Sequence, residues 1–84
     1  MTSLPQSPIV QHQADLTRFS VNNEAILEYH LTGHSVDFHH TFVPPSLRGQ
    51  GIAEKLVRSG LAWAKAEQLT IKASCSYVQK FLKD

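Results

Sequence analysis

Cysteine, net charge and long apolar runs are all scarce in this sequence, and each shortage excludes a class of protein. The chain has 84 residues and a single cysteine, Cys75, so it can form no internal disulfide and lacks the four ligands of a cysteine-based zinc site. Its formal net charge of +1 gives no electrostatic reason to expect a nucleic-acid partner. A chain of this size must therefore be stabilised by the packed core of one domain.

The sequence also lacks the features of membrane and exported proteins. No apolar run approaches the roughly 20 residues that span a bilayer, and residues 1–5 lack the charged and apolar regions of a signal peptide. We therefore expect a cytoplasmic protein without a membrane partner. Residues 1–15 carry prolines and glutamines without periodicity, which predicts a flexible lead-in. Order is expected to begin near Leu16, with residues 16–84 as the single domain.

Alternation of polar and apolar residues predicts three β-strands in an antiparallel meander. Residues 18–21 form a short strand, and Asn22-Asn23 is a turn pair that leads into a half-buried strand over 25–32. A third strand is expected over 36–43. It ends at Pro44-Pro45 because proline cannot donate a hydrogen bond to a neighbouring strand.

The hydrophobic period changes after this meander. Apolar residues recur at helical spacing from Gly51 to about Gln68, with charged residues on the other side. A short β-type run follows over 69–73, and Ser74 or Cys75 opens a final short helix. The sequence therefore predicts an α+β fold in the order β-β-β-α-β-α. The exposed edges of so small a sheet are compatible with a monomer or a weak homodimer.

Two glycines and an arginine stand at the junction between the third strand and the long helix, in the stretch Arg48-Gly49-Gln50-Gly51-Ile52-Ala53. Backbone N–H groups at the start of a helix have no partner within the helix, and the helix dipole adds positive charge there, so such a turn is suited to an anion. Glycine allows phosphate to approach the main chain, and arginine can pair with phosphate oxygens. The alternative is that the glycines only shape a loop and Arg48 is a solvated charge.

This stretch resembles the [Gln/Arg]-x-x-Gly-x-[Gly/Ala] signature of the GNAT N-acetyltransferase superfamily, whose loop binds the pyrophosphate of acetyl-CoA. The resemblance extends over His40-Thr41, Val43-Pro44 and residues 74–78, in the order found in small single-domain GNAT-like proteins, and covers about residues 25–82. It implies a GNAT-like fold with acetyl-CoA or CoA as the ligand. The implied cofactor-binding residues are Val43, whose main chain would pair with the pantetheine arm, Arg48, Gly49, Gln50, Gly51, Ile52 and Ala53.

Cys75 is the candidate catalytic residue, as a nucleophile or as a residue that lines the site. It falls between the last strand and the last helix, where a helix N-terminus favours the thiolate that attacks thioesters. The alternative is a buried cysteine that packs as a small apolar side chain. Many GNAT enzymes carry a tyrosine acid where Leu82 stands here, and many small relatives carry a glutamate where Phe42 stands. Tyr77 is a possible substitute acid, or a tyrosine packed with its hydroxyl in water.

Five histidines raise the possibility of a metal site, but their spacing does not favour one. His39 and His40 are adjacent on a strand and so face opposite sides, while His30 and His34 flank a turn. No metal is therefore expected, and His40 is predicted to lie in the core.

These observations favour an acetyl-CoA-dependent N-acetyltransferase that acts on an amine acceptor. Its partners are then acetyl-CoA and that amine, which the sequence does not identify. A CoA- or acyl-CoA-binding module without turnover is the first alternative, favoured by the missing tyrosine and glutamate. The second is a protein-interaction domain in which the glycine loop has only a structural role.

Overall fold

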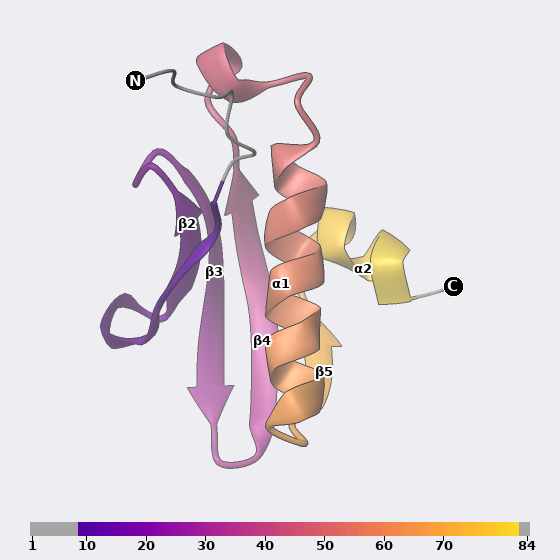
Figure 1. The fold of residues 1–84 in the computed structure, drawn as a ribbon. Helices are drawn as coiled ribbons and strands as arrows, with labels where there is room; N and C mark the ends of the chain where they lie inside the picture. Colours follow the sequence, from indigo (N-terminus) through magenta and orange to yellow (C-terminus); the bar gives the residue numbers. More distant parts are fainter. Residues whose placement is uncertain (1–8, 83–84) are drawn as a thin grey trace.

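A five-stranded sheet forms the centre of the domain in the computed structural model, which describes residues 9–82 (Figure 1). The strands follow the order β1-β2-β3-β4-β5 across the sheet. Neighbours are antiparallel except β4 and β5, which are parallel because helix α1 connects them. The strands are β1 (Gln11–Gln13), β2 (Arg18–Val21), β3 (Ala25–Thr32), β4 (Ser35–Phe42) and β5 (Thr70–Ala73).

Helix α1 (Ile52–Ala66) supplies most of the helical side of the core. It is amphipathic, and its buried residues recur at helical spacing: Ile52, Leu56, Val57, Gly60 and Ala64. They pack against the buried side chains of the sheet, among them Phe19, Val21, Leu27, Tyr29, Val36 and Phe38. The second helix, α2 (Ser76–Leu82), adds the buried Val78 to this cluster.

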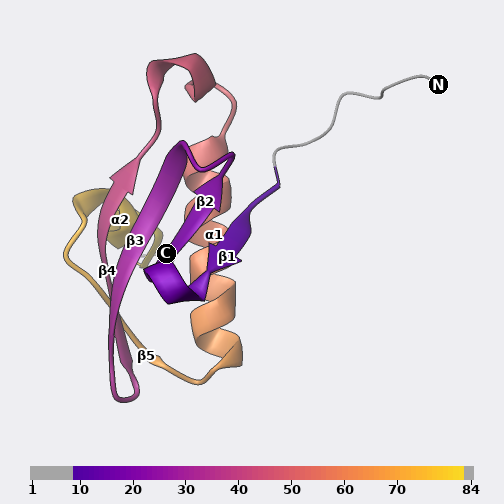
Figure 2. The ribbon, with the colours of Figure 1, turned by 90° about the vertical axis from the view of Figure 1, so that its left-hand side faces the viewer.

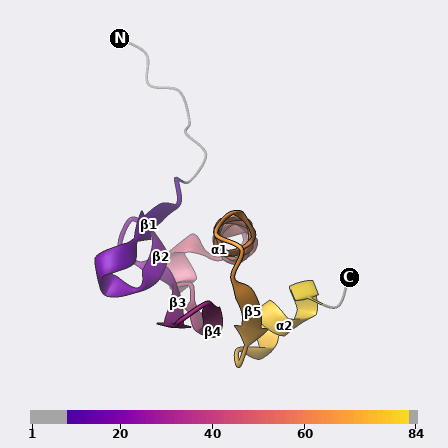
Figure 3. The same ribbon diagram turned by 90° about the horizontal axis from the view of Figure 1, so that it is seen from below.

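Both helices lie on the same side of the sheet. Figure 2 shows the strands in front with α1 and α2 behind them, and Figure 3 shows α1 on the concave side of the curved sheet with α2 next to β5. Within residues 9–82, no helix covers the opposite face of β3 and β4. No helix of this part of the chain is long and apolar enough to cross a membrane.

The predicted α+β class and the order of elements from residue 18 onward are confirmed. Asn22 and Asn23 adopt positive φ angles of 55° and 56°, as expected of a turn pair between two strands. The long helix and the last strand lie within a residue or two of their predicted bounds. The final helix begins at Ser76, just after the predicted start.

The predicted start of order near Leu16 is wrong, because the sheet begins at Gln11. Strand β1 pairs with β2, and a 3-10 helix over Ala14–Leu16 joins the two strands. The observed order is therefore β-β-β-β-α-β-α. Residues 1–8 of the predicted lead-in lie outside the described residues.

Side-chain contacts hold β1 on the sheet although it has only three residues. The Gln13 Oε1 atom accepts hydrogen bonds from Arg18 Nε at 2.7 Å and from Ser20 Oγ at 2.9 Å. Ser20 is fully buried, so this bond satisfies a polar group that would otherwise be costly to bury. His12 stacks on Phe19 at a centroid distance of 4.2 Å, and its Nε2 atom is hydrogen-bonded to the Tyr29 hydroxyl at 2.7 Å.

His12 is expected to make the stability of the fold depend on pH. Burial lowers the pKa of His12 from its usual value of 6.5, so the unfolded chain binds a proton more readily than the folded one. The contribution is present above pH 6.5 and is lost as the pH falls through the lower folded pKa. Urea unfolding of wild type and His12→Gln between pH 8 and pH 5 should show a smaller acid-induced loss in the variant.

The exposed turn histidine His34 provides the control for this measurement. His34→Gln is expected to keep the wild-type pH dependence, because it makes no comparable contact with the core aromatics. Equal acid-induced losses in wild type and His12→Gln would contradict the role assigned to His12.

The predicted core position of His40 is also wrong. Tyr29 of β3 pairs with Phe38, but the preceding Glu28 pairs with His40, so His39 is an extra residue in β4. Such a β-bulge reverses the alternation of side chains along the rest of the strand. His40 is therefore exposed, Thr41 is half-buried, and Phe42 is 44% exposed.

Candidate ligand-binding site

The connection from β4 to α1 has the backbone geometry that the two glycines favour. After Phe42 the chain passes through Pro44 and a 3-10 helix over Pro45–Leu47 to reach the glycines. Gly49 and Gly51 have φ angles of 82° and 71°, in the left-handed region that disfavours other residues. A Cβ atom built on either glycine meets no atom within 4 Å. The glycines are therefore required by the backbone conformation, and they leave open space beside the main chain.

Gly51 is the N-cap of α1, and no side chain caps this end of the helix. Its carbonyl accepts a hydrogen bond from the Lys55 N–H at 3.1 Å, which closes the first turn. The N–H groups at the very start of α1 have no acceptor inside the helix, and the helix dipole places partial positive charge around them. This end of α1 is therefore suited to an anionic group.

A pocket of about 190 Å³ opens at this helix end. It contains every predicted cofactor-binding residue except Gln50, which lies exposed within the same loop. Three further residues that the sequence did not assign to the cofactor line it. The lining residues are Val43, Leu47, Arg48, Gly49, Gly51, Ile52, Ala53, Glu54 and Tyr77.

Arg48 crosses from the loop to the end of β4. Its Nε atom donates a hydrogen bond to the Val43 carbonyl oxygen at 3.0 Å. This contact uses one of the five N–H donors of the guanidinium, so the two terminal nitrogens stay available for an anion. The side chain of Arg48 is thus fixed beside the glycines at the mouth of the pocket.

Tyr77 brings α2 into the wall of this pocket. Burial raises the pKa of the Tyr77 hydroxyl above its usual value of 10.0, and the negative charge of Glu54 raises it further. The Tyr77 ring packs against Phe81 in an edge-on arrangement at 5.2 Å. Tyr77 therefore stays protonated near neutral pH and provides a hydrogen-bond donor from the α2 side.

Beyond this pocket, β4 and β5 separate. Their pairing runs from Ser35 and Thr70 to Phe38 and Ala73, and β4 continues to Phe42 paired with β3 alone. Among the described residues, the last residues of β4 therefore have no strand partner on their β5 side, and this open edge leads toward Val43. Such an edge can accept an extended ligand through main-chain hydrogen bonds.

Cys75 lies at the point where the two strands separate. Its N–H donates to the Phe38 carbonyl at 3.1 Å, and its Sγ atom is hydrogen-bonded to Thr41 Oγ1 at 3.5 Å. Burial raises the pKa of this thiol, but the bonds from Thr41 and from the backbone N–H groups of Val78 and Tyr77 lower it more, so the net pKa lies below the usual 9.0. Cys75 is half-buried, outside the lining of the 190 Å³ pocket and next to the unpaired edge of β4.

No histidine lines the 190 Å³ pocket. His12 belongs to the aromatic cluster with Phe19, His34 lies in the β3–β4 turn, and His39 and His40 lie at the bulge of β4, where His40 is exposed. Within residues 9–82, no group of three or more histidine, cysteine, aspartate or glutamate residues could hold a metal ion.

Comparison with known proteins identifies the family to which this chain and its fold belong. The sequence profile of the GCN5-related N-acetyl-transferase family matches residues 17–84, and the chain belongs to this family. The NMR structure of a GCN5-like protein from Staphylococcus aureus superimposes with a TM-score of 0.71 at 26% identity, over 94% of this chain and 81% of that one. The family and the fold implied by the loop sequence are thereby confirmed.

The chain is also similar to a vertebrate protein called Protein NATD1. The Xenopus tropicalis protein is 36% identical over 87 residues, which cover 95% of this chain and 80% of the relative. The Homo sapiens protein is 35% identical over 81 residues, which cover 89% of this chain and 72% of the relative. Acetyl-CoA is the ligand generally used by the GCN5-related family.

Proposed function

We propose that this protein is an acetyl-CoA-dependent N-acetyltransferase that transfers an acetyl group to an amine. The observation that carries the proposal is the pocket at the start of α1, where the glycine loop, Arg48 and Tyr77 meet next to the end of β4. A free helix N-terminus with an arginine beside it suits a pyrophosphate. The open backbone around Gly49 and Gly51 allows the close approach that such a group needs.

The proposed arrangement assigns each part of the ligand to residues of this chain. The N–H groups from Gly49 to Ala53 and the guanidinium of Arg48 hold the pyrophosphate, and the main chain at Val43 pairs with the pantetheine arm. An arm bound along β4 leads toward Thr41 and Cys75. Acetyl-CoA supplies an acetyl group activated as a thioester.

Two routes for the acetyl group are compatible with this arrangement. In the first, the Cys75 thiolate forms a bond to the acetyl carbon as the carbon–sulfur bond to CoA breaks, and the CoA sulfur takes up a proton; an amine then receives the acetyl group from Cys75. In the second, the amine attacks the thioester directly, Cys75 lines the site, and close positioning accelerates the reaction. The lowered pKa of the Cys75 thiol supports the first route.

Intact-mass measurement after incubation with acetyl-CoA tests the proposal. Transfer through the thiol predicts the mass gain of one acetyl group in the wild type and none in Cys75→Ala. Direct transfer predicts no gain in either protein but acetylation of an amine in a screen of polyamines, amino acids and peptides. CoA binding without any acetylated product would contradict the transferase.

That last outcome would support a CoA-binding module without turnover. The presence of Phe42 and Leu82 favours this second candidate, because neither residue can move a proton where the family resemblance implies an acid or a base. Absence of both CoA binding and transfer would instead leave the glycine loop as a structural feature of an interaction domain.

Glu54 is expected to oppose binding of an anion at the proposed site. It lines the pocket in the first turn of α1, and Arg58 offsets its charge only in part through an exposed ion pair at 2.7 Å. Interactions between exposed charges are worth about 0.2–1 kcal/mol, and here the interaction with a bound anion is repulsive. Glu54→Gln should therefore bind CoA more tightly, by up to about fivefold, in calorimetry at low salt.

Glu67→Gln is the matched control, because Glu67 is an exposed carboxylate at the other end of α1. It should leave the affinity unchanged. The gain in Glu54→Gln should shrink as salt screens the charges, and weaker CoA binding by Glu54→Gln would contradict this account of the pocket.

A further inference from the structure

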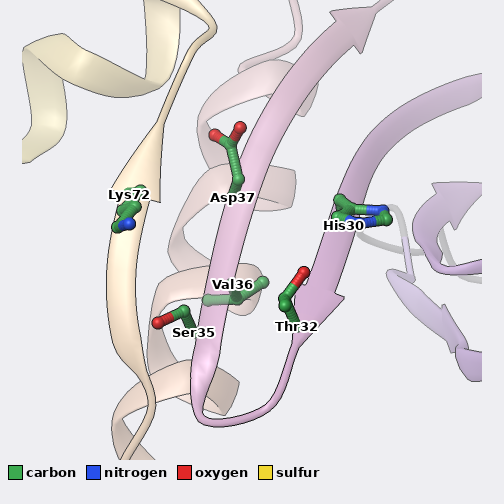
Figure 4. Close-up of a pocket in the computed structure, with 6 residues that line it drawn as sticks. All are labelled: His30, Thr32, Ser35, Val36, Asp37 and Lys72. Carbon is green, nitrogen blue, oxygen red and sulfur yellow. The ribbon is translucent and has the colours of Figure 1, made fainter.

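The face of the sheet opposite the helices carries a shallow polar basin of about 330 Å³ near the β3–β4 turn (Figure 4). Strands β3, β4 and β5 all contribute to its lining, which consists of His30, Thr32, Ser35, Val36, Asp37 and Lys72. Figure 4 shows the Asp37 carboxylate directed along β4, away from the turn. Asp37 therefore reaches past the basin toward the end of β5.

Asp37 makes two hydrogen bonds to the residue that precedes Cys75. Its Oδ1 atom accepts from the Ser74 N–H at 2.8 Å, and its Oδ2 atom accepts from the Ser74 hydroxyl at 2.7 Å. The side-chain bond with Ser74 is the main reason that the pKa of Asp37 lies below its usual 3.8; burial opposes this lowering, and the backbone bond with Ser74 and the nearby His39 and His30 add to it. The carboxylate is thus ionised at neutral pH and bridges β4 to the β5–α2 connection.

The same connection is held on both sides of Ser74. The Gln79 Nε2 atom donates to the Ala73 carbonyl at 2.8 Å, and the Cys75 N–H donates to the Phe38 carbonyl at 3.1 Å. Ser74 itself is attached to β4 through the side chain of Asp37, which accepts hydrogen bonds from the Ser74 N–H and hydroxyl. Ser74 is exposed, so these hydrogen bonds are not needed to satisfy a buried polar group.

We propose that Asp37 is a positioning residue that fixes the Ser74 turn and so holds the Cys75 thiol against Thr41, where β4 and β5 separate. The role rests on the proposed function, in which Cys75 stands at the thioester. Without the bridge, the β5–α2 connection keeps the Cys75 N–H bond to the Phe38 carbonyl but loses both bonds at Ser74, so Sγ is held less firmly beside Thr41 and the α2 N–H groups. Asp37 acts on the chemistry only through this placement.

The pH profile of Cys75 alkylation by iodoacetamide tests the proposal in the absence of CoA. In Asp37→Ala the midpoint of the profile should rise toward that of an ordinary thiol, because the hydrogen bonds that favour the thiolate are no longer held in place. Asp37→Asn keeps an oxygen acceptor for the Ser74 N–H and should give a smaller rise. Lys72→Ala, which changes a charged residue of the same basin, should match the wild type.

Ser74→Ala keeps the measurement decisive if Asp37→Ala fails to fold. It removes the hydroxyl bond alone at an exposed position, and it should raise the midpoint in the same direction by less. Folding of each variant is checked by circular dichroism. A midpoint equal to that of the wild type in folded Asp37→Ala, or in Ser74→Ala if Asp37→Ala does not fold, would overturn the proposal.

Measurements of Cys75 acetylation and of CoA affinity in Asp37→Ala distinguish a failure of the role proposed for Asp37 from a failure of the proposed function. If Cys75 accepts acetyl groups, Asp37→Ala should slow its acetylation by about ten- to a hundredfold, since small displacements of a reacting group are costly. Its affinity for CoA should stay within about twofold of the wild type, because the residues of the glycine loop are unchanged. A wild type that binds no CoA would overturn the proposed function, while the thiol profile would still test Asp37.

Discussion

Replacement of Gly51 by tryptophan is expected to weaken CoA binding by about a hundredfold or more. The side chain would enter the pocket of about 190 Å³ at the helix end and separate a pyrophosphate from the backbone N–H groups. Each hydrogen bond to a charged group contributes about 1.5–3 kcal/mol, so loss of two corresponds to a hundredfold or more in affinity. Calorimetric titration with CoA measures the change.

The control must reproduce the backbone strain of this substitution without filling the pocket. Gly51 has a φ angle of 71°, where a residue with a Cβ atom costs about 1–2 kcal/mol. Gly33 has a φ angle of 57° in the β3–β4 turn, also with open space around its Cα atom. Gly33→Trp should therefore lose similar stability and bind CoA normally. Equal loss of binding in both variants would show that strain, and not the pocket, is responsible.

Replacement of Gly60 by valine is expected to destabilise the fold strongly. Gly60 packs directly against the sheet, and a Cβ atom there would lie 2.9 Å from both Leu27 Cδ2 and Phe38 Cε1. Leu27 and Phe38 are almost completely buried, so neither side chain has space to move away. Overpacking of a core costs about 1–3 kcal/mol, a large fraction of the roughly 5–15 kcal/mol that stabilises a domain.

Thermal unfolding followed by circular dichroism measures this loss. A destabilisation of 1–3 kcal/mol lowers the Tm of a domain of this size by roughly 5–20 °C. Ser59→Val places the same side chain one position earlier, at a half-buried site, and should change the Tm much less. If Gly60→Val had the same Tm as the wild type, the close contact between α1 and the sheet at Gly60 would be contradicted.

The elements that local patterns determine could be predicted from the sequence. The Asn22-Asn23 turn follows from the tolerance of asparagine for positive φ, and α1 follows from its apolar stripe. Strand β1 could not be predicted, because residues 11–13 have no apolar alternation and are held by side chains from β2 and β3. The bulge at His39 was also missed, and it reversed the predicted orientation of His40.

The candidate site likewise contains residues that the sequence could predict and residues that only the tertiary fold brings together. The glycine loop is contiguous in sequence, so its residues could be proposed together, and the structure brings nearly all of them into one pocket. Tyr77 and Glu54 belong to different helices, and only the tertiary fold places them across the pocket from each other. The bond between Thr41 and Cys75 likewise joins residues 34 positions apart, which no local motif could show.

The most direct test of the proposed function is an NMR titration of the ¹⁵N-labelled wild type with CoA. Saturable shifts are expected for the backbone N–H signals of Val43, of residues 48–54 and of Tyr77, with smaller changes in β1 and in the β3–β4 turn. No shifts at millimolar CoA, or saturable shifts confined to other parts of the chain, would contradict the assignment of the glycine loop as the CoA site.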